Sequence, residues 1–226
     1  MHYSPIPRSP APLFSPAIDH LRQQLSRLTS GGLIGGSALK LGLPEIEQAL
    51  PWHGLARGAL HEMTGDRSAI TGFLAALLGQ NPRCGEVLWV TPASSLHASG
   101  LAEFGLDHRR LTIVSARRAD DRLWSIEEGL SELGYGAVVA EIDSINLAET
   151  HRLQSAAKQG GGIGFLMRRD SQPSAALTRW HINWANSDGY RPCWRLRLER
   201  CQGGETRLAW NVAWDDAALS FHLVPR

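Results

Sequence analysis

The 226-residue sequence predicts an α/β fold with a mostly parallel central sheet that antiparallel strands extend towards the C-terminus. Two observations support this prediction. From residue 54 onwards, short apolar runs alternate with segments of helical period, which is the pattern of a parallel sheet covered on both faces. After residue 178, apolar and charged residues alternate, which is typical of half-buried antiparallel strands joined by hairpins.

Composition places the chain among ordinary globular proteins. It has 43% hydrophobic and 20% charged residues, and its net charge of +1 gives the whole molecule no nucleic-acid signature. No apolar run approaches the roughly 20 residues that span a bilayer, and the start lacks the features of a signal peptide, so we expect a cytoplasmic protein. Cys84, Cys193 and Cys201 have no zinc-type spacing; we expect buried free thiols and no metal.

The first 49 residues are predicted to lie outside the core. Residues 1–16 are rich in proline and are expected to form a flexible N-terminal arm. Residues 17–49 are expected to form an N-terminal helix and a linker. The helix carries one narrow apolar stripe, made of Ile18, Leu21, Leu25 and Leu28. Such a stripe can dock on its own domain or on a partner, and both alternatives stay open.

Residues 50–226 are expected to form the core, with an antiparallel β-hairpin extension at the C-terminal end. The predicted buried strands are 86–91, 111–115, 136–142 and 162–167. Helices are predicted for 95–105 and for a stripe of Leu123, Ile126, Leu130 and Leu133. The predicted hairpin joins 194–201 to 206–214 through QGGE, and a final strand is expected at 218–224.

The stretch GDRSAITGFLAALLG, residues 65–79, has the setting of a phosphate-binding loop, because a short apolar run precedes it and a helical period follows. A working loop has the pattern GxxxxGK[ST]. With Gly65 as the first glycine, Ile70 replaces the second glycine, Thr71 the lysine and Gly72 the hydroxyl residue. Arg67 lies too early in the loop to take the position of the lysine without remodelling it.

The residues after this loop nevertheless keep the apolar spacing of a helix that packs on a sheet. Its apolar residues, at i, i+3, i+4, i+7 and i+8, are Ile70, Phe73, Leu74, Leu77 and Leu78. The structure of the element has therefore been kept while its ligand chemistry has been lost. We expect a degenerate, inactive nucleotide site and no bound cofactor.

The order and spacing of several segments resemble a degenerate RecA fold, and among such proteins the ImuA family. The matching segments are LPWHGLARGALHEMTG (50–65), WVTPASSLHASGLAEFGLDHRRLTIV (89–114), GYGAVVAEIDSINL (134–147) and GIGFLMRR (162–169). The ending, WRLRLERCQGG with WNVAWDD and AALSFHLV, looks specific to ImuA. The resemblance implies a RecA-like P-loop NTPase fold with a degenerate nucleotide site.

Carried over residue by residue, the resemblance implies a protein that is not an enzyme. The glutamate that activates water in RecA falls at Ala93, which cannot act as a base. The metal-binding acid falls at Glu141 or Asp143, and the sequence does not choose between them. With the lysine position at Thr71, catalytic residues are absent and ATP hydrolysis is not expected.

The DNA-binding loops of RecA are shortened in this sequence. The first corresponds to the stretch from Asn146 to Gly161, and only RRDSQPS (168–174) remains of the second. Arg168 and Arg169 are weak candidates for contacts with DNA phosphates, but a solvated edge is the favoured interpretation of two arginines at a strand end.

Tryptophan and arginine mark the C-terminal strands as a second candidate surface. Trp210 and Trp214 fall on one face of a strand, where core packing is favoured over an exposed partner surface. Arg195, Arg197 and Arg207 alternate with apolar residues, so one face is expected to be basic while the other is packed.

The resemblance implies a non-catalytic accessory protein of SOS mutagenesis, an adaptor in error-prone translesion DNA synthesis. The implied partners are ImuB (a Y-family-polymerase-like protein), an error-prone DnaE-type polymerase and RecA, with at most weak or indirect DNA contact and no membrane contact. Two alternatives remain: a SulA-type inhibitor of cell division, and a RecA-type ATPase with an atypical loop that uses Arg67 or an arginine from a partner.

Overall fold

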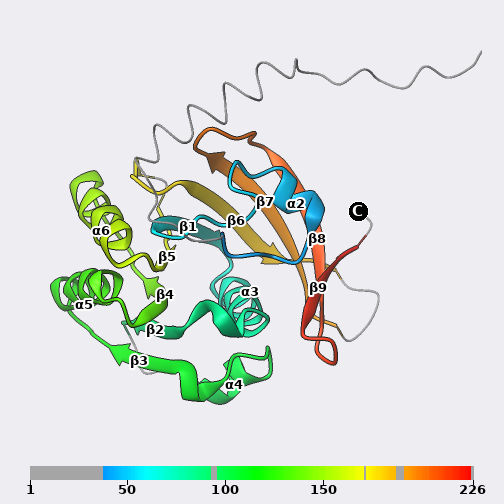
Figure 1. The fold of residues 1–226 in the computed structure, drawn as a ribbon, viewed down its shortest axis with the longest axis horizontal. Helices are drawn as coiled ribbons and strands as arrows, with labels where there is room; N and C mark the ends of the chain where they lie inside the picture. Colours follow the sequence, from blue (N-terminus) through cyan, green and yellow to red (C-terminus); the bar gives the residue numbers. More distant parts are fainter. Residues whose placement is uncertain (1–37, 93–95, 171, 187–190, 225–226) are drawn as a thin grey trace, which may run out of the picture.

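The computed structural model describes residues 38–92, 96–170, 172–186 and 191–224. Nine strands form one sheet in the order β3-β2-β4-β5-β1-β6-β7-β8-β9 within these ranges (Figure 1). The strands are β1 (Ala59–Gly65), β2 (Glu86–Thr91), β3 (Leu111–Ser115), β4 (Tyr135–Glu141), β5 (Ile163–Met167), β6 (Thr178–Trp184), β7 (Cys193–Cys201), β8 (Leu208–Asp215) and β9 (Ser220–Val224). The helices are α2 (Pro44–Gln48), α3 (Arg67–Gly79), α4 (Ala98–Ala102), α5 (Ala119–Ser131) and α6 (Leu147–Gly160), with short 3-10 turns η1 (Pro82–Cys84) and η2 (His108–Arg110).

The sheet has the predicted mixture of strand directions. Strands β3, β2, β4, β5, β1 and β6 are all parallel, and β6 to β9 then pair in antiparallel fashion. The predicted strands at 86–91, 111–115, 136–142 and 162–167 are therefore confirmed to within one residue, and the hairpin of β7 and β8 and the final strand β9 to within two. The predicted α/β fold class is confirmed.

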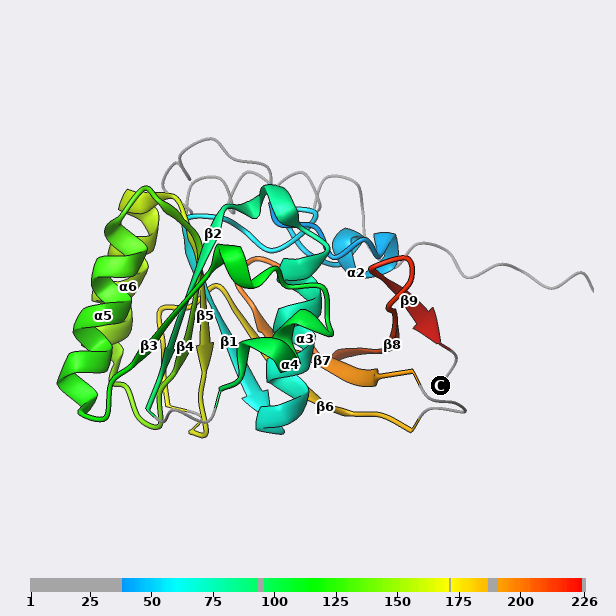
Figure 2. The ribbon, with the colours of Figure 1, turned by 90° about the horizontal axis from the view of Figure 1, so that it is seen from below.

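Helices cover both faces of the parallel half (Figure 2). Helices α5 and α6 lie side by side on one face, and α3 and α4 lie on the other. Two buried apolar clusters correspond to these faces: Leu74 and Trp89 belong to the one around α3, and Leu130 and Leu153 to the one under α5 and α6. All five apolar residues predicted for the face of α3 are buried.

Three differences from the sequence predictions have simple physical reasons. Leu133 is 85% exposed because α5 ends at Ser131, two residues before it. The segment expected to be a shortened loop is helix α6, which begins with a reciprocal capping box between Asn146 and Glu149. Strand β6, which was not predicted, joins the parallel half of the sheet to the antiparallel half.

The N-terminal boundary of the core lies earlier than residue 50. Leu39 pairs with Leu55 through backbone hydrogen bonds, and Leu41 and Ile46 are buried in the cluster around α3. Residues 38–49 therefore pack on the core instead of forming a linker. The arm at 1–16 and the stripe of Ile18, Leu21, Leu25 and Leu28 lie outside the described residues.

The structure also describes the cysteines, the lengths of the helices and the grouping of side chains that could bind a metal ion. All three cysteines are buried free thiols, as predicted, and burial raises the pKa of Cys201 to about 12. Among the described residues, no helix is long and apolar enough to cross a membrane. Within the same ranges, no group of three or more His, Cys, Asp or Glu side chains is arranged to hold a metal ion.

Candidate nucleotide site

The turn between β1 and α3 is pressed against strand β6. Gly65 has φ +113°, and a Cβ atom there would lie 2.3 Å from the carbonyl oxygen of Ile182, so only glycine fits. The next backbone N–H, that of Asp66, donates to the Ile182 carbonyl and to the Asn183 side chain, both at 3.0 Å. This N–H is consequently directed at the protein's own sheet and is not available to a phosphate.

A carboxylate occupies the N-terminus of α3, where a phosphate would bind in a working loop. Asp66 caps the helix, and its Oδ1 accepts hydrogen bonds from Ser68 Oγ at 2.5 Å and from the Ala69 backbone N–H at 2.8 Å. These bonds hold the pKa of Asp66 below its usual value. The helix end is thus satisfied by an internal anion, which would repel a second one.

Arg67 connects this turn to the acids at the end of β4. Its guanidinium forms an ion pair with Glu141, whose side chain is 5% exposed, and lies 3.9 Å from Oδ1 of Asp143. The structure therefore brings together three predicted site residues that are 74 and 76 positions apart in the chain. Both candidates for the metal-binding acid face a cation supplied by the protein itself.

Two tryptophans, which the sequence analysis did not place in the site, cover the first turn of α3. The indole of Trp184 donates to Ser68 Oγ and that of Trp194 to the Ala69 carbonyl, each at 2.8 Å. Their rings stack with centroids 5.3 Å apart. A Cβ atom on Gly72 would lie 3.3 Å from Trp184 and 3.4 Å from Trp194. The position of the loop hydroxyl is consequently closed by aromatic rings.

Two further residues, Thr71 and Ala93, were predicted to belong to this site. Thr71, at the lysine position, is half-buried in the first turns of α3. Ala93, at the position of the catalytic glutamate, lies outside the described residues.

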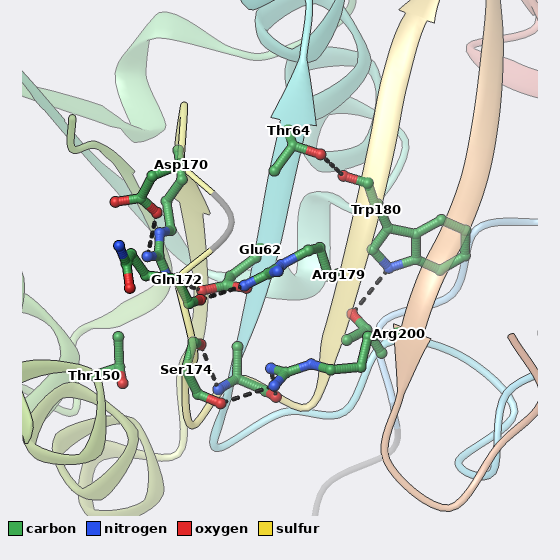
Figure 3. Close-up of polar contacts among 12 residues, drawn as sticks. Glu62, Thr64, Thr150, Asp170, Gln172, Ser174, Arg179, Trp180 and Arg200 are labelled. Atoms are coloured by element: carbon green, nitrogen blue, oxygen red, sulfur yellow. Dashed lines mark hydrogen bonds and ion pairs between the residues drawn. The ribbon is translucent and has the colours of Figure 1, made fainter. Parts of the chain in front are cut away.

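Arg168 does not form the solvated edge that the sequence predicted. Its side chain is fully buried and forms ion pairs with Glu62 on β1 and with Asp170. Glu62 also accepts a hydrogen bond from Arg179 Nε at 2.8 Å, where β1 meets β6 (Figure 3). Burial acts to raise the pKa of Glu62, but hydrogen bonds from Ser174 and Arg179 and the charge of Arg168 outweigh it and lower that pKa.

This pairing changes the candidate DNA contacts. Because Arg168 neutralises a buried carboxylate, its guanidinium is not available to a phosphate. Arg169 is exposed and lies 3.8 Å from Asp143, as expected for a solvated residue. Sequence reasoning could not find this pairing, because Glu62 and Arg168 are 106 positions apart.

The two tryptophans of β8 have different environments. Trp214 is 1% exposed and packs edge-on against Phe221, with ring centroids 5.1 Å apart, so core packing is its role and it is not a partner surface. Trp210 is half-buried and packs against Trp180 at 6.1 Å. Both lie on one face of the sheet, as their spacing predicted, and this is the face that carries α3.

The sheet order, the β1–α3 turn and the acid at the end of β4 define a RecA-like protein whose nucleotide site is filled by its own side chains. The crystal structure of the RadB recombinase aligns with 83% of this chain and all of that chain, with a TM-score of 0.63 and 14% identity, which shows the same fold.

Sequence comparison identifies the family. Two ImuA proteins, from two strains of Caulobacter vibrioides, are each 33% identical to this chain over 193 residues, covering 74% of this chain and 79% of theirs. The chain therefore belongs to the ImuA family. The cell division inhibitor SulA of Photorhabdus laumondii is 28% identical over 82 residues, which cover 36% of this chain and 46% of that protein. No family model matches the chain.

Proposed function

We propose that this protein is a non-catalytic RecA-like adaptor of SOS mutagenesis. The observation that carries the proposal is the ion pair between Arg67 and Glu141, which places a guanidinium on an acid that would otherwise serve a metal ion. Membership of the ImuA family supplies the biological setting of DNA damage and mutagenesis.

The physical basis of an adaptor role is a fold kept without its nucleotide chemistry. The lysine that neutralises the phosphates is replaced by Thr71, the helix end is capped by Asp66, and Gly72 lies under two indoles. A domain that cannot alternate between nucleotide states can still present RecA-like surfaces to other proteins. The proposed partners are ImuB, an error-prone DnaE-type polymerase and RecA, and the proposed place of action is the cytoplasm.

The proposed contact surface is the predicted stripe of Ile18, Leu21, Leu25 and Leu28. Aspartate at two of these positions would place charges in an apolar interface, where they are costly to bury. Co-purification of the tagged full-length chain with ImuB, the polymerase and RecA after DNA damage tests the adaptor role. The double variant L21D/L25D should abolish recovery of RecA or ImuB.

The matched control is Gln23→Asp, which adds a charge on the opposite side of the predicted helix and should leave recovery unchanged. Equal recovery by L21D/L25D and the native chain would refute this surface. Failure of the native chain to recover any of the three partners would refute the adaptor role itself.

The SulA match supports a second candidate, an inhibitor of cell division. Overproduction distinguishes the two: filamentation of cells that lack the mutagenesis partners would favour division inhibition. An ATPase that uses Arg67 is a third candidate, but it requires Arg67 to leave Glu141 and Asp143 and to turn towards the nucleotide.

A further inference from the structure

One face of the antiparallel half of the sheet has no described helix over it. Helices α5 and α6 cover this face only over the parallel strands (Figures 1 and 2). On the opposite face, side chains of β7 such as Trp194, Leu196 and Leu198 are buried in the cluster around α3. Alternate residues of the same strands therefore project from the uncovered face, which we call the outer face of β6–β8.

The outer face carries two exposed arginines on β7, Arg195 and Arg197. Their cross-strand neighbours on β6 and β8 are asparagine, histidine and alanine. Across the strands, Arg195 lies between Asn183 and Asn211, and Arg197 lies between His181 and Ala209. Arg195 makes no ion pair or hydrogen bond to a residue in the described part of the chain. Arg197 forms an ion pair with Glu199, at 2.6 Å, and its side chain remains half-exposed.

Cations exceed carboxylates along this side of the sheet. The arginines on or beside it are Arg168, Arg179, Arg191, Arg195, Arg197 and Arg200, and the carboxylates are Glu62, Asp170, Glu199 and Asp215. Arg200 donates to the backbone carbonyls of Ser174 and Ala176 (Figure 3). The arginines therefore outnumber the carboxylates by two, and Arg195 is among the exposed ones.

We propose that the outer face of β6–β8 binds the phosphodiester backbone of a nucleic-acid strand. Arg195 and Arg197 are two residues apart on one strand, so they stand about 7 Å apart and point the same way. A guanidinium matches phosphate oxygens with two parallel hydrogen bonds, and the neighbouring amide of Asn211 adds a neutral donor.

The chemistry of the face favours a nucleic acid over an acidic protein. Protein interfaces depend on buried aromatic or aliphatic anchors, whereas the outer face offers Ala209, Asn211 and Thr64 at the corresponding positions. The tryptophans Trp180, Trp194, Trp210 and Trp214 of these strands pack on the other face, so among the described residues these rings are not available to stack with bases here. Recognition is therefore of the backbone and independent of sequence.

Fluorescence anisotropy with a labelled oligo-dT of about 30 nucleotides tests the inference at about 50 mM salt. The double variant R195A/R197A should weaken binding by about tenfold or more, and the slope of log affinity against log salt should become shallower by about 1.4, as for two lost contacts to single-stranded DNA. R117A/R118A, which removes the same charge at the start of α5, should stay within about twofold of the native chain. Oligo-dA should bind as tightly as oligo-dT.

Three results would overturn the inference: equal weakening by both double variants, no binding by the native full-length chain at low salt, or competition by polyglutamate as effective as by DNA at equal charge. The last result would make an acidic protein the ligand of this face. The inference goes beyond the adaptor role and does not depend on it. The DNA-binding assay uses the isolated protein, whereas the adaptor role is tested by co-purification with partners, so either can fail without the other.

Discussion

The guanidinium of Arg67, in the first turn of α3, forms an ion pair with the carboxylate of Glu141, at the end of β4. In a working phosphate loop these two elements meet through a nucleotide and its metal ion. Here they meet directly, so the protein supplies the cation. The chain's own side chains therefore make the contact between these two elements in this structure.

Removing Arg67 should destabilise the protein measurably. The variant R67A removes the cation that pairs with the nearly buried Glu141, and because Arg67 itself is half-exposed we expect a loss of about 1–2 kcal/mol in the free energy of unfolding. Urea unfolding measures the loss. The exposed neighbour Arg169→Ala serves as the control and should change stability by less than about 0.5 kcal/mol. Equal effects of both variants would contradict a structural role for the pair.

Removing Arg168 should cost more, because both it and Glu62 are fully buried. The variant R168M is expected to lose about 3–5 kcal/mol, since a buried carboxylate loses one of its two cations and keeps only Arg179. The double variant R168M/E62Q should lose less than the sum of the two single variants. Strict additivity in urea unfolding would argue against direct coupling.

Restoring the hydroxyl of a working loop should be unfavourable. In G72T the new side chain meets Phe104, Trp184 and Trp194, and we expect a loss of about 1–3 kcal/mol from overpacking. The same substitution in a Trp184→Ala background should cost less, because Trp184 is the half-exposed member of the three. Thermal unfolding of the native chain, G72T, W184A and the double variant G72T/W184A measures the difference. If G72T destabilised the W184A protein as much as the native chain, this explanation would be wrong.

The stability of the protein should fall as the pH drops below 6.5. Trp180 donates to Thr178 Oγ1, Thr178 donates to His61 Nδ1, and His61 Nε2 donates to the Ala56 carbonyl. Burial lowers the pKa of His61 from 6.5 to about 4, against the opposing effect of the Ala56 hydrogen bond. Between pH 6.5 and about 4, His61 is protonated in the unfolded chain but neutral in the folded chain. This difference lowers the free energy of unfolding by up to about 3 kcal/mol.

Above pH 6.5 His61 is neutral in both states and contributes no pH dependence. The measurement is the free energy of unfolding at intervals from pH 7 to about 4, compared between the native chain and H61Q. The variant should show a shallower decline, because glutamine does not titrate. Identical slopes would exclude His61 as the cause.

Much of the fold could be predicted from the sequence because its signals are local. The runs EVLWVT and GAVVAEI are short, apolar and rich in β-branched residues, and the α3 stripe repeats at helical spacing. Helix α6 was missed although Asn146 and Glu149 form a capping box, because its buried face uses Thr150, Ala156 and Ala157 with a single leucine.

The candidate site was predictable only in part. The loss of the loop lysine and hydroxyl is visible in the sequence. The cap at Asp66 was not predicted, although aspartate is a common residue at that position. The contacts that fill the site join positions more than 70 residues apart, as with Arg67 and Glu141 or Trp184 and Ser68. A single sequence carries no local pattern for such pairs, and the same limitation explains the buried Arg168.

Isothermal titration of magnesium-ATP into the full-length protein tests the central claim most directly. If Asp66, Arg67 and the two indoles occupy the site, no saturable binding should be seen with a dissociation constant tighter than about 1 mM, and no phosphate should be released. Saturable, magnesium-dependent binding in the micromolar range that R67A abolishes would contradict the claim, because Arg67 would then serve the nucleotide and not Glu141.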